Sequence, residues 1–160
     1  MGHYYPATGG AFSSGHPGLI EKTSEYGIDD QVYFVGFVRV EELVYLYAKA
    51  KMMVFPSLFE GFGIPLVEAM AVGCPVLASN NISLPEVGGD TVEFFDPLSH
   101  QSIGEAIAKV WHDTNLREKL IRKGKVRAQH FTSQKLAYNH LKAFQESVES
   151  FSMFRYCWNN

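Results

Sequence analysis

Short apolar runs that alternate with stretches of helical character constrain the fold of this chain most. Residues 52–55 and 75–79 are apolar runs of strand length, and Pro56 ends the first of them. Residues 91–95 form a third such run. Residues 65–72, between the first two, begin with Pro and continue with good helix formers. Strands that alternate with helices are typical of a parallel sheet, so the predicted fold class is α/β.

Further elements follow from the same patterns. Residues 31–35 are predicted to form an additional strand before the first helix of the alternation. Residues 41–51 carry the apolar stripe Leu43, Val44, Tyr47 and Ala48, which predicts a helix. The other predicted helices are a short one at 19–26, two from residue 101 on, and a final one that Thr132 or Ser133 caps and that runs to about residue 148.

Length and composition indicate one soluble domain. The chain has 160 residues, and its apolar fraction of 46% and charged fraction of 19% are ordinary for a globular protein. A net charge of −3 argues against a nucleic-acid partner. No apolar run approaches the ~20 residues that span a bilayer, and no signal peptide is recognisable. Cys74 and Cys157 provide no disulfide framework, which favours the cytoplasm, and Cys74 is predicted to be a small core residue.

Two carboxylates flank a glycine-rich turn at the start of the helix 65–72. Glu60 precedes the turn and Glu68 lies one turn into the helix, eight positions later. Gly61 and Gly63 have no Cβ, so their backbone N–H groups can approach a ligand closely, and either can adopt a positive φ. The N–H groups and the dipole of the first helical turn favour an anion by roughly 0.3–2 kcal/mol.

The two carboxylates predict that the ligand also carries hydroxyl groups. Each can accept hydrogen bonds from hydroxyl groups, which contribute about 1.5–3 kcal/mol when the acceptor is charged. A ligand with an anionic centre and hydroxyls at both ends is a sugar nucleotide. The alternative is that Gly61 and Gly63 serve only as a turn and that Glu68 only compensates the helix dipole.

The segment from Phe59 to Met70 resembles the Glu-x7-Glu signature of the retaining glycosyltransferases of family 4, the glycogen synthase and sucrose synthase type. The resemblance extends over roughly residues 26–141, because further motifs follow in the family's order. These are Val32-Tyr33-Phe34-Val35-Gly36, Phe55-Pro56-Ser57, Glu68-Ala69-Met70-Ala71-Val72-Gly73-Cys74-Pro75-Val76, Leu84-Pro85-Glu86-Val87 and Phe95-Asp96-Pro97.

The resemblance implies a GT-B fold, in which two Rossmann-like domains face each other, with this chain as part of the C-terminal, donor-binding domain. Residues 21–150 are then the nucleotide-sugar-binding domain, residues 1–20 an irregular N-terminal segment and residues 151–160 an aromatic tail. The family's donor domain begins with a strand and a basic loop whose Arg and Lys clamp the donor diphosphate. No match to this part is found, so the chain is predicted to be N-terminally truncated, poorly stable and inactive by itself.

The resemblance also implies roles for the residues that match. The implied reaction transfers a sugar from a nucleoside diphosphate sugar to an acceptor hydroxyl with retention of configuration, without a metal or other cofactor. Glu60 is the catalytic candidate, because it matches the glutamate that contacts the donor sugar. The donor-binding candidates are Gly61, Phe62 and Gly63 for the sugar and phosphate, Glu68 for the ribose, Leu66 and Val67 near the diphosphate, and Gly36 and Phe37 along the base.

Alternatives remain open at this point. The chain is either the donor half of a transferase whose acceptor half is a missing N-terminal domain, or a non-catalytic module that binds a nucleotide sugar. A cluster of basic residues after residue 118 is a solvated helix face or contacts an anionic membrane surface. Glu86 fits a helix start as well as a ligand contact, and the six histidines show no metal-ligand spacing. The residues of this basic cluster are Lys119, Arg122, Lys123, Lys125 and Arg127.

Overall fold

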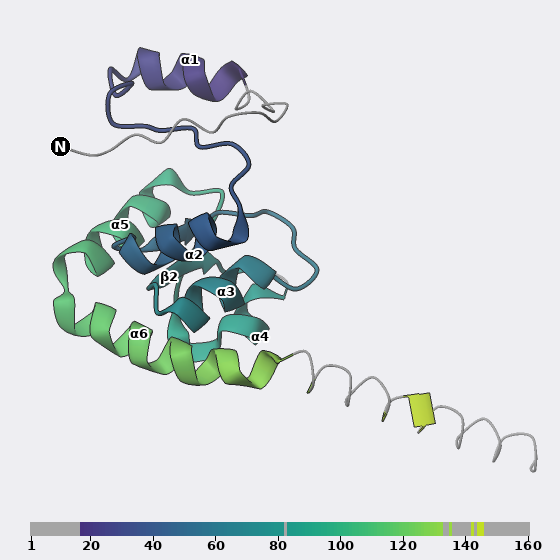
Figure 1. The fold of residues 1–160 in the computed structure, drawn as a ribbon. Helices are drawn as coiled ribbons and strands as arrows, with labels where there is room; N and C mark the ends of the chain where they lie inside the picture. The colour runs from purple at the N-terminus through teal and green to yellow at the C-terminus, as the bar shows by residue number, and fades with distance from the viewer. Residues whose placement is uncertain (1–16, 82, 133–134, 136–141, 143, 146–160) are drawn as a thin grey trace, which may run out of the picture. The chain divides into compact units, whose positions relative to one another are not determined.

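The computed structural model describes residues 17–81, 83–132, 135, 142, 144 and 145, and the chain divides into two compact units at residues 45 and 46 (Figure 1). Most of the predicted final helix and the whole aromatic tail lie outside the described residues, as do the first 16 residues. The domain boundaries predicted at residues 20 and 150 stay predictions.

The first unit contains α1 (Pro17–Glu25) and the beginning of α2 (Val40–Lys49), which confirms both predicted helices. Glu42 in the first turn of α2 accepts a hydrogen bond of 2.8 Å from the backbone N–H of Arg39, and its carboxylate also pairs with the Arg39 side chain at 3.0 Å. A carboxylate that receives backbone donors at this end of a helix offsets the unsatisfied N–H groups there.

The strand predicted at residues 31–35 does not form, and this part of the prediction is wrong. Residues 32–35 have no strand conformation, and Tyr33, Phe34 and Val35 are 71%, 43% and 50% exposed. A strand is stable only when a neighbour takes up its backbone N–H and C=O groups. Among the described residues no strand pairs with this segment, so its strong β propensity is not sufficient.

The second unit is built on a parallel three-stranded sheet in the order β1-β2-β3. Val54 in β1 is level with Leu77 in β2, which in turn is level with Glu93 in β3. One helix connects β1 to β2, and a short helix with a 3₁₀ turn connects β2 to β3. The elements are β1 (Met53–Phe55), α3 (Ile64–Val72), β2 (Val76–Ser79), α4 (Leu84–Gly88), η1 (Gly89–Thr91) and β3 (Val92–Phe95). The predicted Rossmann-like α/β class is confirmed.

Helices α5 (His100–His112) and α6 (Thr114–Ala128) follow the sheet, and η2 (Gln129–Phe131) continues α6. Side-chain oxygens cap both helices, because Ser99 accepts from the Ser102 N–H at 3.1 Å and Asp113 accepts from the Leu116 N–H at 2.8 Å. Such caps satisfy donors that a helix start otherwise leaves unpaired. Figure 1 shows α3, α4, α5 and α6 arranged around β2.

The core has two layers because successive strand residues point to opposite faces of the sheet. Val76 and Ala78 in β2 pack on one face with Leu66, Ala69 and Met70 of α3, and all of them are buried. Leu77 packs on the other face with Phe95, Ala106, Val110 and Leu120. The sheet is therefore covered on both sides, as expected for a parallel sheet.

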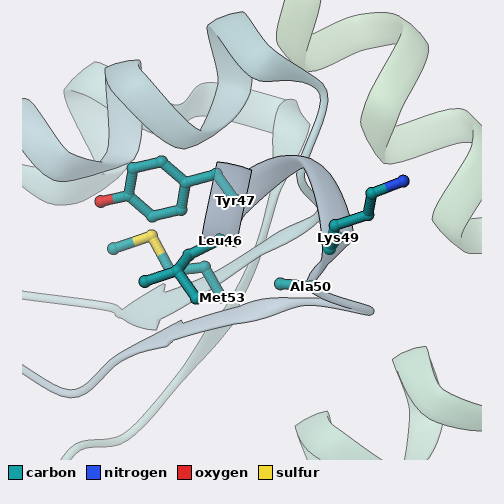
Figure 2. A pocket seen from close by; sticks show the side chains of 5 residues that line it. All are labelled: Leu46, Tyr47, Lys49, Ala50 and Met53. Atoms are coloured by element: carbon teal, nitrogen blue, oxygen red, sulfur yellow. The ribbon is translucent and has the colours of Figure 1, made fainter. Parts of the chain in front are cut away.

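An open apolar hollow lies where the end of α2 meets β1. Its lining residues are Leu46, Tyr47, Lys49, Ala50 and Met53, and Figure 2 shows the Tyr47 ring beside Leu46 and Met53 while Lys49 points away. The pKa of Tyr47 is raised, chiefly by burial and then by the negative charge of Glu68. The hollow adjoins the start of β1, whereas the loop that carries Glu60 follows the end of this strand.

Cys74 is a buried core residue, as predicted, with 3% of its surface exposed. Burial raises the pKa of its thiol to about 11, so the reactive thiolate is scarce at neutral pH. In a variant with Cys157→Ser, we expect Cys74 to resist a thiol reagent at pH 8 in the native protein and to react fully in denaturant. Rapid native labelling, measured by mass spectrometry, would contradict this burial.

Candidate functional site

The candidate site is formed by the loop of residues 56–63, which leaves the carboxyl end of β1 and enters α3. In open α/β sheets, ligands bind beyond the carboxyl ends of the strands. Pro65 stands in the first turn of α3, where its missing N–H costs no helical hydrogen bond. Glu60 of the Glu-x7-Glu segment therefore lies on this loop, and Glu68 lies on α3.

Gly63 and Gly61 differ in what they contribute to the turn. Gly63 precedes α3 in the left-handed conformation, with φ 84° and ψ 49°. A Cβ at this position would lie 2.6 Å from Cδ2 of Leu84, which is 1% exposed. Gly61 does not have a positive φ, and a Cβ there would meet nothing within 4 Å. Gly63 is therefore required by the fold, whereas Gly61 leaves open space beside its backbone.

The two candidate carboxylates lie in different environments. Glu60 is half-buried, and its Oε1 lies 3.1 Å from the Ser57 hydroxyl, which also lies 3.1 Å from the Phe59 carbonyl oxygen. Glu68 is exposed on α3, close enough to Tyr47 for its charge to raise the pKa of that phenol. Glu60 is thus held by its own loop, whereas Glu68 is available to solvent.

Side chains of the loop after β2 donate hydrogen bonds to the backbone of the loop of residues 56–63. The Asn81 side-chain amide donates to the Leu58 carbonyl at 2.7 Å, and the Ser83 hydroxyl donates to the Glu60 carbonyl at 2.9 Å. The backbone N–H of Asn80 donates at 2.9 Å to the carbonyl of Phe95, the last residue of β3. The sequence analysis missed these residues, although polar side chains directly after a strand of a parallel sheet are a signal for this edge.

The end of α6 contacts the site from another side. The Phe62 ring meets the Phe131 ring edge to face at 5.5 Å, and the Arg127 guanidinium lies 5.4 Å from the centre of the Phe131 ring. Arg127 also donates to the Val87 carbonyl at 3.0 Å and to the Glu86 carbonyl. Aromatic and charged groups of α6 and η2 therefore brace both the glycine turn and α4.

The basic cluster of residues 119–127 lies on α6, and its members are called the α6 cations from here on. Two of them have partners inside the protein. Arg127 binds the carbonyls at the end of α4, and Lys123 pairs with Asp90, whose carboxyl pKa is lowered chiefly by this hydrogen bond. Contact of the α6 cations with an anionic membrane stays a prediction. Glu86 lies in the first turn of α4 with an exposed side chain, which agrees with the helix-start interpretation.

The remaining predicted site residues are spread over both units. Phe62 is 41% exposed and Val67 is half-buried. Leu66 is fully buried, and its backbone N–H donates to the Gly63 carbonyl at 3.0 Å. Gly36, with φ 63°, and Phe37, 89% exposed, belong to the first unit. Their place beside the other site residues stays a prediction.

Metal binding and membrane insertion are two further functions that the described residues can be tested for. In the described ranges, no three His, Cys, Asp or Glu side chains come together in a way that would hold a metal ion. The helices of the described part are also all too short or too polar to cross a membrane.

Comparison with known proteins identifies relatives along most of the chain. Residues 15–127 match the family described as glycosyl transferases group 1. The O-antigen chain mannosyltransferase B of Escherichia coli is 36% identical over 127 residues, which are 79% of this chain and 32% of that protein. A serotype-specific mannosyltransferase, WbdA, of the same species is 33% identical over 82% of this chain and 16% of its own length. The chain thus spans a third or less of these relatives.

Solved structures agree with the sequence matches. A sucrose-phosphate synthase from Thermosynechococcus elongatus superimposes with a TM-score of 0.74 at 28% identity, over 82% of this chain and 34% of that one. The C-terminal domain of a glycosyl transferase group 1 family protein from Francisella tularensis gives a TM-score of 0.63 at 31% identity, over 71% of this chain and 60% of that one. The fold, the glutamate-flanked turn and these matches agree, and the chain belongs to the glycosyl transferases group 1 family.

Proposed function

We propose that this chain forms the donor-binding half of a retaining glycosyltransferase, which transfers a sugar from a nucleoside diphosphate sugar to an acceptor hydroxyl. The observation that carries the proposal is the arrangement of Glu60 and Glu68 around the left-handed Gly63, at the carboxyl edge of a parallel sheet. A second domain, which binds the acceptor, completes the enzyme. No metal or other cofactor takes part in the proposed reaction.

The proposed donor lies along the glycine turn. The exposed Glu68 accepts hydrogen bonds from the ribose hydroxyls, and the half-buried Glu60 accepts them from the sugar. The open space beside Gly61 lets the diphosphate approach the backbone and the amino end of α3. The remaining proposed contacts are Phe62 and Gly63 with the sugar and phosphate, Leu66 and Val67 with the diphosphate, and Gly36 and Phe37 with the base.

These residues also suggest how the reaction is assisted. As the bond between the sugar and the diphosphate breaks, negative charge develops on the leaving phosphate. The positive end of the α3 dipole and the N–H groups of the turn stabilise that charge. Glu60 holds the sugar by its hydroxyls, so that the acceptor hydroxyl attacks from the face that the diphosphate leaves and passes its proton to the leaving diphosphate. The configuration is thereby retained.

We propose mannose as the transferred sugar. Two relatives from Escherichia coli, which match 79% and 82% of this chain, are named mannosyltransferases. A further relative with 48% identity, over 41% of this chain, is the MMP alpha-(1->4)-mannosyltransferase of Mycolicibacterium hassiacum. The donor that follows from this proposal is a nucleoside diphosphate mannose. We further propose that transfer takes place in the cytoplasm.

Calorimetric titration of the 160-residue chain tests the proposal. We expect saturable binding of GDP-mannose or UDP-mannose, and of the matching nucleoside diphosphate. Glu68→Gln is expected to weaken both the diphosphate and the nucleotide sugar by about ten-fold or more, because both lose a charged ribose acceptor.

The matched control is Glu118→Gln, which removes an equal charge from an exposed position on α6. It is expected to leave both affinities unchanged. If the wild-type chain binds no nucleoside diphosphate sugar, or if Glu68→Gln binds as tightly as the control, the proposed donor site is wrong.

A further inference from the structure

The backbone of the loop that carries Glu60 accepts hydrogen bonds from side chains that lie far from it in the sequence. Ser83 is separated from Glu60, and Asn81 from Leu58, by 23 positions, yet their side chains donate to those two backbone carbonyls at 2.9 Å and 2.7 Å. The Ser57 hydroxyl lies 3.1 Å from the Glu60 carboxylate itself. The loop that carries Glu60 is therefore fixed on both sides of Phe59, whose side chain is 77% exposed.

The loop after β2 is itself anchored at both of its ends. The backbone N–H of Asn80 binds the Phe95 carbonyl at 2.9 Å, and the N–H of Leu84 binds the Asn81 carbonyl at 3.3 Å. Leu84 is almost fully buried under Gly63. The hydrogen bonds from Asn81 and Ser83 thus connect the Glu60 loop to residues that follow β2 at the edge of the sheet.

We propose that Asn81 and Ser83 are positioning residues, which set the position of Glu60 for the donor sugar. The inference rests on the proposed function, since it assumes that Glu60 contacts that sugar. Neither side chain is assigned to the donor itself, and both act through the backbone of the Glu60 loop. Removing either one leaves a carbonyl of this loop without its side-chain donor and frees the loop to move.

A positioning role of Asn81 and Ser83 and a purely stabilising role differ in their effect on the affinities for the sugar and nucleotide parts of the donor. Glu60 is assigned to the sugar, and Glu68, on α3, to the nucleotide. Gly61 and Gly63 of the same loop are assigned to the diphosphate, which both ligands carry, so a loss of that contact affects both affinities. A displaced Glu60 weakens, in addition, the affinity that the sugar gives over the bare nucleoside diphosphate. A general loss of stability would instead leave the ratio of the two affinities unchanged, because both ligands would lose the same folded fraction.

The experiment compares Ser83→Ala, Asn81→Ala and Ser83→Thr with the wild-type chain. Affinities for GDP-mannose and GDP, or for the uridine pair if that one binds, are measured by calorimetry. Amide hydrogen exchange of residues 56–63 reports loop mobility without any ligand. We expect each alanine variant to exchange faster in this loop and to lower the ratio of nucleotide-sugar to nucleotide affinity about five-fold. Ser83→Thr keeps a hydroxyl and is expected to restore both readouts.

Ser99→Ala is the matched control, because it removes a serine hydroxyl that caps α5 and does not contact the Glu60 loop. It is expected to change neither the loop exchange nor the affinity ratio. If the alanine variants bind like the wild type, or if loop exchange is unchanged, Asn81 and Ser83 do not position Glu60. If the wild-type chain binds no nucleotide sugar, the proposed function itself fails, and the inference fails with it.

Discussion

Replacing Glu60 by Gln is expected to reduce sugar transfer by about 10²–10³-fold, while binding of the nucleoside diphosphate stays within about two-fold of the wild type. Glutamine keeps the side-chain oxygen that accepts from the Ser57 hydroxyl, so the loop geometry is preserved. The substitution removes only the negative charge. A neutral acceptor holds the sugar hydroxyls less strongly, and the difference grows as positive charge develops on the sugar in the transition state.

The assay combines this chain with a separately produced acceptor-binding half and follows transfer of labelled mannose from its nucleotide. Glu118→Gln serves again as the control, and we expect it to transfer sugar at the wild-type rate. Undiminished transfer by Glu60→Gln would refute the assigned role. If the wild-type chain binds the donor but transfers no sugar with any acceptor half, it is a binding module without catalytic activity.

Replacing Gly63 by Ala is expected to destabilise the second unit by about 2–5 kcal/mol. The left-handed backbone at φ 84° costs a residue with a Cβ about 1–2 kcal/mol. The new methyl group would also lie 2.6 Å from Cδ2 of the buried Leu84, and such overpacking typically costs about 1–3 kcal/mol. Gly61→Ala is the control, expected within about 0.5 kcal/mol of the wild type because its Cβ meets nothing.

Urea unfolding followed by circular dichroism measures both variants. A double-mutant cycle with Leu84→Ala separates the two causes, because removing the Leu84 side chain relieves the clash and leaves the backbone strain. We therefore expect the double variant to be more stable than the sum of the two single effects predicts. Equal stability of Gly63→Ala and Gly61→Ala would contradict the structural account of this turn.

The sequence predicted those parts of the fold that depend on local patterns. The strands β1, β2 and β3 and the helix α3 appear where apolar runs and helix formers alternate, whereas the short helix α4 was not predicted. Residues 32–35 have an equally strong apolar pattern and form no strand. Strands β1, β2 and β3 each pair with a neighbouring strand, whereas residues 32–35 have no paired strand among the described residues. The sequence of a short segment alone does not contain that information.

The same limit applies to the candidate site. Glu60, Gly63 and Glu68 were identified because they lie close together in one segment. Asn81 and Ser83 were missed because a helical crossover brings them beside this segment from 23 positions away. The different roles of Gly61 and Gly63 also depend on a distant residue, because the Leu84 side chain fills the space beside Gly63 and does not reach Gly61.

The contact between Phe62 and Phe131 has a consequence for the order of folding. Phe131, at the end of η2, is synthesised well after the sheet and the glycine turn. While the chain emerges from the ribosome, β1, α3 and β2 can already pack together, whereas the turn still lacks its aromatic neighbour and α4 lacks Arg127. The glycine turn therefore acquires its aromatic neighbour only after η2 has been synthesised.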